Sequence, residues 1–335
     1  GVAERQLPGD GVGLRVHRGR HLAQRDMRFL HRLADAGGRG GAGRVRPERG
    51  CAGANVAENV GARHRRDFAV DDAEPTRTVT VVRWDEGVVT SVMDTVAEET
   101  PVAFKYQGVA HVVMLASPRD LEDLAVGFTL TESIVGARSE IRSVEVSAVD
   151  GALEVNLSIA PERFSQLLKR QRNLSGRTGC GMCGAETLAD AIRAPVPLVG
   201  GLSLRGADVQ SALAGLASGQ VLNARTGSIH AAGWAVPGRG VVLVREDVGR
   251  HNALDKLIGA LLRQGEDLEK GFVVMSSRAS YELVQKVATV GITTLVAVSA
   301  PTGFAIRSAE EFGVTLVGFA RTGRHVVYAH AERFV

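Results

Sequence analysis

The sequence predicts an α/β fold in which a small mixed α/β unit precedes a layered, mostly parallel α/β domain. From residue 241 onward, short apolar runs alternate with helical patterns, as expected for a parallel sheet covered by helices. Before that, strand-like runs dominate residues 79–158. Hydrophobic residues make up 44% of the chain and charged residues 23%, which is typical of a globular protein.

The first unit is expected to span residues 76–175. Its predicted elements are strands at 79–84, 102–106 and 111–115, a helix at 121–134, a hairpin of strands 143–149 and 153–158, and a helix at 161–172. Ser117 and Pro118 indicate the helix start, because Ser caps helix N-termini and Pro suits the first turn. Asp150 and Gly151 are typical of the turn in a hairpin.

The second unit, residues 176–335, begins with a glycine-rich loop that is followed by helical segments up to about residue 218. After the loop, the predicted strands are 241–245, 272–275, 295–298, 315–318 and 326–328, and the predicted helices are 252–263, 281–289 and 304–311. In open α/β sheets, ligands bind beyond the carboxyl ends of the strands, where helix N-termini offer free N–H groups. The functional site is therefore expected at those strand ends.

Small, hydroxyl and basic side chains gather in four segments that follow these strands. The segments are residues 246–251, 276–280, 299–303 and 319–324. Hydroxyl groups and backbone N–H groups suit phosphates, and Arg278, Arg321 and Arg324 could add bidentate contacts. Each segment alone has a structural explanation, because Ser and Thr are ordinary helix caps and exposed Arg is common. Four such segments on one edge favour an anionic ligand such as a nucleotide or a pyrophosphate.

Individual residues of these segments have more than one interpretation. Ser277 and Arg278 are the candidates for phosphate binding. Glu246 and Asp247 could bind guanine N–H groups or cap a helix, and capping is slightly favoured. His251 could relay a proton or support thiolate formation, or it could be a structural histidine at a helix start.

The glycine-rich loop holds Cys180 and Cys183, three positions apart. Arg177 and the helix expected from Ala185 onward could both lower a thiol pKa and so raise the nucleophilic thiolate fraction. Such a thiolate can take sulfur from the persulfide of another protein and pass it to an acceptor. Cys183 could assist, resolve the persulfide as a disulfide, or only orient the loop.

Two other thiol sites fit the cysteine pair less well. A zinc site needs four ligands; His230 and His251 could complete one, but no second paired motif supports it. No bound metal is therefore expected. A thioredoxin-like redox pair follows a strand and opens a helix, which this loop does only in part.

Two further motif matches are rejected because the residues around them do not fit the motif. Residues 179–184 match the dinucleotide fingerprint G-x-G-x-x-G, but polar residues precede them and Leu204 stands where an acidic residue is needed. A zinc deaminase needs H-x-E before P-C-x-x-C. The only H-x-E match, at 330–332, comes last in the chain, and Gly179 stands in place of the proline.

Residues 1–75 are expected to be a disordered extension or a segment assigned to the chain in error. Residues 1–70 contain 14 Arg, no Lys and seven acidic residues, a net charge of +7, although the whole chain carries only +3. This Gly- and Arg-rich stretch cannot bury enough apolar surface to offset its ordering entropy. The chain begins with Gly, and its first methionine is Met27. No nucleic-acid partner is expected, and Cys51 receives no role.

The expected location is the cytoplasm, with no membrane partner. No apolar run approaches the roughly 20 residues that span a bilayer. No charged and then apolar leader opens the chain.

Several long motifs occur together in the order known from one family. They are GRTGCGMCG at 176–184, REDVGRHNALDK at 245–256, SSRASYE at 276–282 and SAPT at 299–302. From about Thr78 to Val335, the sequence resembles the FdhD family of formate dehydrogenase accessory sulfurtransferases. The resemblance implies a sulfur carrier that takes sulfur from a cysteine desulfurase. It delivers the sulfur to the bis-molybdopterin guanine dinucleotide cofactor before the cofactor enters formate dehydrogenase.

The resemblance also implies residue roles, a fold and an assembly. It places the persulfide on Cys180, makes Cys183 the second loop cysteine, and assigns cofactor binding to the segment Phe319, Ala320, Arg321, Thr322, Gly323, Arg324. It implies a cytidine-deaminase-like later domain without the zinc chemistry, and a homodimer. The alternative function is a chaperone for the cofactor or the apoenzyme, with thiols that only shape the loop or bind zinc. The choice between molybdenum and tungsten stays open.

Overall fold

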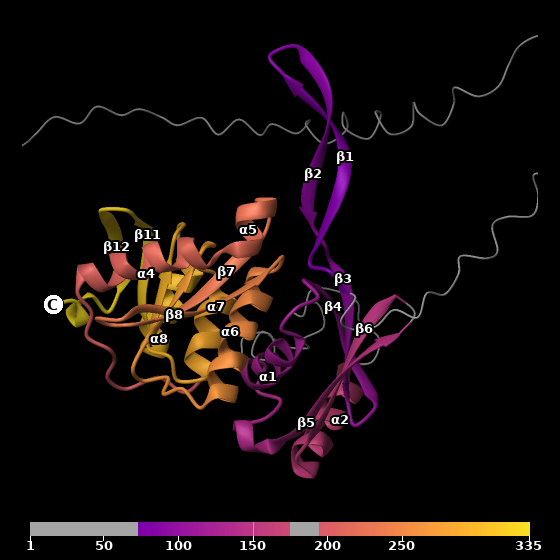
Figure 1. Cartoon of the computed structure of the whole chain (residues 1–335). Helices are drawn as coiled ribbons and strands as arrows, with labels where there is room; N and C mark the ends of the chain where they lie inside the picture. Colours follow the sequence, from indigo (N-terminus) through magenta and orange to yellow (C-terminus); the bar gives the residue numbers. More distant parts are fainter. Residues whose placement is uncertain (1–72, 150, 175–193) are drawn as a thin grey trace, which may run out of the picture. The chain divides into compact units, whose positions relative to one another are not determined.

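The computed structural model describes residues 73–149, 151–174 and 194–335 (Figure 1). The extension expected before residue 76 lies almost wholly outside the described residues, and so do Cys180 and Cys183. Among the described residues, no helix combines the length and the apolar character needed to cross a bilayer.

A two-stranded antiparallel ribbon opens the described chain. It consists of β1 (Thr76–Asp85) and β2 (Val88–Ala97), which form a sheet of their own (Figure 1). Glu86 and Gly87 both have positive φ, of 47° and 90°, as a two-residue turn between twisted strands requires. The sequence predicted only the first strand, and β2 was missed.

A four-stranded sheet with the order β4-β3-β6-β5 follows. Its strands are β3 (Thr100–Tyr106), β4 (Val109–Ala116), β5 (Ile141–Val149) and β6 (Ala152–Ile159), and its helices are α1 (Leu121–Thr131) and α2 (Pro161–Leu174). Alternate residues of β3 and β6 point into a core shared with α1 and are fully buried. The predicted hairpin and both predicted helices are therefore present.

The first helix begins at the predicted residue, Leu121, but its predicted cap, Ser117, and its predicted end, residue 134, were wrong. Asp120, which has a φ of 53°, occupies the N-cap position, and the helix ends at Thr131. The buried Ser117 hydroxyl instead accepts a hydrogen bond from the backbone N–H of Val248, 3.1 Å away. Ser117 therefore connects two distant segments and does not cap the helix.

A six-stranded sheet within residues 230–329 has the order β12-β11-β10-β9-β7-β8. Its strands are β7 (His230–Val236), β8 (Gly240–Asp247), β9 (Phe272–Met275), β10 (Thr294–Ala297), β11 (Thr315–Arg321) and β12 (Arg324–Ala329). Strands β9, β10 and β11 pair in parallel, whereas β7 is antiparallel to both β8 and β9, and β12 is antiparallel to β11. Strands β8 to β11 therefore run the same way, and β7 and β12 run the other way.

Helices cover this sheet in layers, as predicted. They are α4 (Gly206–Gly219), α5 (Val221–Thr226), α6 (Arg250–Gln264), α7 (Tyr281–Thr289) and α8 (Gly303–Phe312). One buried cluster joins one face of the sheet to α6, α7 and α8, and a second joins the other face to α4. The α/β layering is confirmed, while the likeness to cytidine deaminases stays a prediction.

Helices α1 and α6 connect the two sheets through close backbone contact. A Cβ added to Gly127 would lie 1.8 Å from the carbonyl oxygen of Asp255, and one added to Gly259 would lie 1.8 Å from that of Asp123. Only glycine permits backbones to approach this closely. The expected boundary at residues 175 and 176 falls where the structure is not described.

Candidate functional site

The four predicted ligand-binding segments lie at the carboxyl ends of β8, β9, β10 and β11. Because these strands run in the same direction, the segments 246–251, 276–280, 299–303 and 319–324 share one edge of the sheet, here called the rim. The antiparallel strand β7 begins at this edge, where His230 pairs with Asp247.

Backbone hydrogen bonds fix neighbouring rim segments to one another. The N–H of Ser276 donates to Ala231 O at 3.0 Å, and that of Ser299 to Ser277 O at 3.4 Å. The N–H of Phe319 donates to Ser299 O at 3.1 Å. The rim is therefore a continuous backbone surface with fixed spacing, which suits the recognition of a large ligand.

Asp247 lies beneath the rim, fully buried. Its carboxylate is 2.7 Å from Lys256 Nζ and accepts hydrogen bonds from the backbone of Ser117 at 3.0 Å and of Gly249 at 2.8 Å, and from Asn252 Nδ2 at 3.0 Å. A direct ligand contact would have to break one of these bonds. Asp247 therefore positions the β8–α6 connection from below.

Glu246 caps a helix, although not the one that follows it. Its carboxylate accepts hydrogen bonds from the N–H groups of Leu222 at 2.8 Å and Asn223 at 2.9 Å, in the first turn of α5. A carboxylate at this position satisfies free N–H groups and complements the helix dipole. Of the two roles considered for Glu246, the structure shows capping.

A polar cluster of His230, Arg250, His251 and Glu282 occupies one part of the rim. Burial, together with the positive charge of Arg250, lowers the pKa of His251 to about 4, so its imidazole is neutral at pH 7. The pKa of His230 is lowered for the same two reasons. Glu282 Oε2 lies 3.9 Å from His251 Nε2, and that nitrogen has no hydrogen-bond partner among the described residues. His251 is therefore a neutral and weakly basic imidazole at pH 7, with its buried Nε2 held near Glu282.

Ser277 and Arg278 follow β9 but differ in their surroundings. Ser277 is buried, and its hydroxyl donates to the carbonyl oxygen of Arg278 at 3.0 Å. The Arg278 side chain is exposed. An anion at the rim could therefore contact the guanidinium directly, whereas the Ser277 hydroxyl already has a partner.

The segment 319–324 forms the turn between β11 and β12. Its first three residues belong to β11, Ala320 is buried, and the other five residues are exposed. Phe319 has a φ of 47°, which is costly for an aromatic residue and common at binding sites. Gln210 of α4 fixes the turn by accepting from Gly323 N at 2.8 Å and donating to Arg321 O at 3.2 Å.

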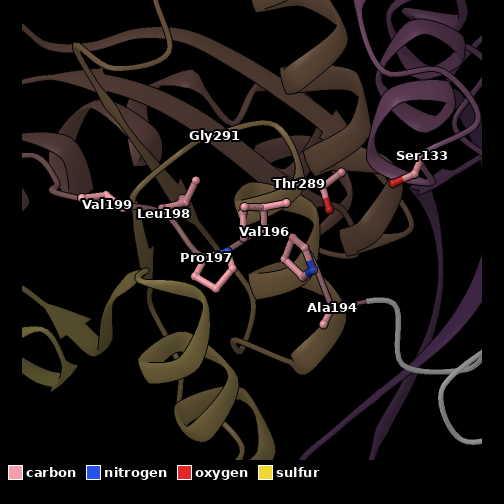
Figure 2. Close-up of a pocket in the computed structure, with 10 residues that line it drawn as sticks. Ser133, Ala194, Val196, Pro197, Leu198, Val199, Thr289 and Gly291 are labelled. Atoms are coloured by element: carbon pink, nitrogen blue, oxygen red, sulfur yellow. The ribbon is translucent and has the colours of Figure 1, made fainter.

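Ala194, the first described residue after the cysteine loop, lies at the edge of the sheet opposite the rim. Ala194 lines a cavity of about 500 Å³ together with Ser133 of the α1–β5 connection and Thr289 and Gly291, which precede β10 (Figure 2). Its ten lining residues include no charged side chain. Leu198 lines the same cavity and donates its N–H to Phe312 O at the end of α8. The segment that continues from the loop is thus anchored away from the rim.

Metal ligands do not cluster in the described part of the chain: it contains no group of three or more His, Cys, Asp or Glu side chains placed to hold an ion. The sequence pattern did not identify Gln210 or Glu282 as part of the rim. Gln210 carried no signal, because it lies in a helix 111 residues before its partner Arg321. Glu282 lies inside the SSRASYE motif, and this membership was the one sequence feature that could have placed it at the rim.

Known proteins match this chain over most of its length. The FdhD/NarQ family model matches residues 97–335. Sulfur carrier protein FdhD of Cupriavidus necator is 49% identical, over 79% of this chain and 93% of its own. Proteins of the same name are 50% identical in Bordetella bronchiseptica, over 72% and 87%, and 48% identical in Xanthomonas campestris pv. campestris, over 76% and 90%.

A solved structure shares the fold. It is a crystal structure of a proposed formate dehydrogenase accessory protein from Desulfotalea psychrophila, with a TM-score of 0.61 and 23% identity, and it covers 78% of this chain and 99% of that chain. The family model covers well over half of the sequence and includes all four motifs. The resemblance inferred from those motifs is confirmed: this chain belongs to the FdhD/NarQ family.

Proposed function

We propose that the chain is a sulfur carrier that accepts sulfur on Cys180 from a cysteine desulfurase. It passes this sulfur to the bis-molybdopterin guanine dinucleotide destined for formate dehydrogenase. The observation that carries the proposal is the high identity to proteins named Sulfur carrier protein FdhD, within a family match that includes the loop at 176–184.

Loading is a thiol–persulfide exchange. The Cys180 thiolate attacks the terminal sulfur of the desulfurase persulfide, so a new S–S bond forms on Cys180. The S–S bond of the desulfurase breaks, and its cysteine leaves as a thiolate. One sulfur atom moves without net oxidation or reduction.

Delivery of that sulfur as sulfide requires two electrons. In the simplest balanced step, the Cys183 thiolate attacks Sγ of Cys180, a disulfide forms between the two cysteines, and sulfide leaves to the metal of the substrate. A dithiol reductant then restores both thiols. This scheme gives the second cysteine the resolving role.

The rim supports the substrate part of the proposal. Bis-molybdopterin guanine dinucleotide carries two pyrophosphate groups, and pyrophosphates bind at strand ends and helix N-termini. The exposed Arg278, Arg321 and Arg324 lie on this edge, where guanidinium groups can pair with phosphate oxygens in a bidentate manner. His251 is neutral at pH 7 and so adds no charge beside the phosphates.

Persulfide mapping tests the carrier function directly. The full chain is incubated with a cysteine desulfurase and cysteine, and the loop peptide is analysed by mass spectrometry without reductant. We expect one added sulfur atom on Cys180, none in Cys180→Ala, and unchanged loading in Cys51→Ser. Cys51→Ser is the matched control because the chain has only three cysteines.

Two results would contradict the proposal. One is that Cys180→Ala supports full formate dehydrogenase activity in cells. The other is an unmodified loop in a protein that still binds guanosine diphosphate, a result that would favour a cofactor chaperone. Binding of guanosine diphosphate by wild type and Cys180→Ala alike would show that the rim works independently of the thiols.

A further inference from the structure

Acidic side chains are scarce at the rim. The four rim segments contain Glu246 and Asp247, and the first turns of α6, α7 and α8 add Glu282 alone. Glu246 and Asp247 are both buried, and hydrogen bonds from the protein already occupy their carboxylates. Of these three carboxylates, that of Glu282 is the one left for a bound molecule, with 41% of its side chain exposed.

The Glu282 carboxylate is ionised at pH 7. Burial works to raise its pKa, but nearby hydrogen-bond donors and the positive charge of Arg250 outweigh burial, so the pKa lies below its ordinary value. The neighbouring imidazole of His251 is neutral at pH 7 and does not cancel this charge. The rim therefore carries an accessible negative charge beside a surface that suits an anionic ligand.

A negative charge at this place cannot serve the phosphates of such a ligand. A carboxylate repels phosphate oxygens, and when ionised it only accepts hydrogen bonds. The partner of Glu282 must therefore be a group with N–H or O–H donors. Two neighbouring N–H donors suit a carboxylate best, because each of its oxygens can then accept one hydrogen bond.

The rings of the proposed substrate present this pair of donors. Guanine and pterin share a 2-amino-4-oxopyrimidine ring, whose edge carries a ring N–H, an adjacent amino group and a carbonyl oxygen. A carboxylate can accept from both donors at once, and a guanidinium can donate to the carbonyl oxygen, as Arg does to O6 of guanine. A site that reads this edge needs one carboxylate and one donor side by side.

Arg250 supplies the donor. It is the first residue of α6 and lies close enough to Glu282 for its charge to lower the pKa of that carboxyl. Its Nε has no hydrogen-bond partner among the described residues. A buried guanidinium nitrogen without a partner is costly, so a ligand acceptor beside Glu282 would complete the site.

We propose that Glu282 selects the 2-amino-4-oxopyrimidine edge by accepting from its ring N–H and its amino group, while Arg250 donates to its carbonyl oxygen. The same contacts serve guanine or pterin. The exposed arginines of the rim remain for the phosphates. This assignment rests on the proposed substrate and adds the residue that distinguishes its rings from other bases, a role that Glu246 and Asp247 cannot fill.

Matched pairs of ligands isolate the amino group. Guanosine diphosphate and inosine diphosphate differ in this group alone, and pterin and lumazine differ in carrying an amino group or an oxygen at the same ring position. In calorimetric titrations of the full chain, the amino-bearing member of a pair should bind about tenfold more tightly, because it adds a hydrogen bond to a charged acceptor. A preference in the first pair identifies guanine as the ring on Glu282, and a preference in the second identifies pterin.

Three variants test whether Glu282 causes the preference. Glu282→Gln should abolish it, because an amide nitrogen would then face an N–H donor of the ring. Glu282→Asp keeps a carboxylate and should retain part of it. Glu311→Gln is the matched control, since it removes the same charge from an exposed position in the last turn of α8. If Glu282 only held α7 in place, its variants would lower the Tm measured by circular dichroism and leave the ratio of affinities unchanged.

Three outcomes would overturn the assignment. They are the absence of a preference in both pairs, a preference that survives in Glu282→Gln, and an equal loss of preference in Glu311→Gln. Persulfide loading of the wild-type chain is a separate measurement. A chain that loads sulfur but shows no preference contradicts only the role of Glu282, whereas a chain that does not load sulfur contradicts the proposed function whatever the titrations show.

Discussion

Helix α6 takes part in two buried aspartate–lysine pairs, and their lysines behave in opposite ways. Asp247 pairs with Lys256 beneath the rim, and Asp255, the residue before Lys256 on α6, pairs with Lys286 of α7. Both lysine side chains are buried. Even so, the pKa of Lys256 lies below its ordinary value and that of Lys286 lies above it.

The number of carboxylates around each lysine explains the difference. Burial lowers the pKa of both. Lys286 has both oxygens of Asp255 at 3.1 and 2.9 Å and a second carboxylate, that of Glu132, at 2.9 Å, and these charges outweigh burial. Lys256 has Asp247 at 2.7 Å, and its next nearest acceptor is the backbone oxygen of Ser117 at 2.9 Å.

The two lysine charges therefore differ in their effect on the stability of the fold. The ammonium of Lys286 is favoured in the folded state, so its contribution persists below the ordinary lysine pKa and is lost only as pH rises through the raised value. Burying the charge of Lys256 is unfavourable at neutral pH, since one carboxylate does not offset desolvation. Asp247, the partner of Lys256, orders the β8–α6 connection, whereas burial raises the pKa of Asp255, the partner of Lys286.

The largest expected effect on stability comes from replacing Lys286, the partner of Asp255. Lys286→Met leaves the Asp255 carboxylate buried, with Thr131 Oγ1 at 2.7 Å as its remaining side-chain donor among the described residues. Breaking a buried pair in this way costs about 3–5 kcal/mol. Urea denaturation followed by circular dichroism should show this loss of unfolding free energy.

Two further variants test the explanation. Asp255→Asn combined with Lys286→Met removes the orphaned charge and should recover at least part of the loss. Glu132→Gln removes only the partly exposed second carboxylate and should cost about 1 kcal/mol. A Lys286→Met protein as stable as the wild type would refute the assignment of stability to this pair.

The glycine contact between α1 and α6 gives the next largest effect. In Gly259→Ala the new methyl group would lie 1.8 Å from Asp123 O, and backbone atoms cannot yield as a flexible side chain can. The two helices must separate, at a cost of about 2–3 kcal/mol. Thermal unfolding would show this loss as a lower Tm.

Gly206→Ala is the matched control, because Gly206 begins α4 and its nearest contact would be His325 Cε1 at 3.4 Å. That change should be neutral or slightly stabilising, since Ala loses less backbone entropy than Gly. Equal destabilisation by both substitutions would show that the close approach of α1 and α6 is not the cause.

The alternation of short apolar runs with helical patterns predicted much of the six-stranded sheet, because central strands such as β9 and β10 are buried throughout. Strand β9 and helix α7 begin and end at the predicted residues, and β10, α8 and β12 differ by one or two. Strand β7 was missed, since its sequence HAAGWAV has little β-branched character. Its extended state depends on pairing with β8 and β9, which a local pattern does not reveal.

The rim was predictable in outline but not in its interactions. Four polar segments follow strands that run in the same direction, so the strand direction alone predicted that they share one edge of the sheet. The binding role considered for Asp247 illustrates the limit. Its carboxylate is held by Ser117, 130 residues earlier, and no local pattern indicates that contact. His230 reaches the rim only because β7 is antiparallel to its neighbours.

The smallest expected effect is a pH dependence at the rim, which the charge of Lys286 also influences. Burial, then the charges of Arg250 and Lys286, lower the pKa of His251 to about 4 from an ordinary value of 6.5. Between these values the unfolded chain binds a proton that the folded chain does not, so stability falls as pH drops through this window. The full shift corresponds to roughly 3 kcal/mol, but with 35% of the side chain exposed we expect about 1 kcal/mol.

Denaturation of wild type and His251→Gln at pH 7 and pH 4.5 isolates this contribution. Wild type should lose about 1 kcal/mol more than His251→Gln over that interval. In Lys286→Met, the part of the shift due to Lys286 disappears, so the pKa of His251 should move up and the difference should shrink. An identical pH dependence in wild type and His251→Gln would mean that the folded state does not lower the pKa of His251.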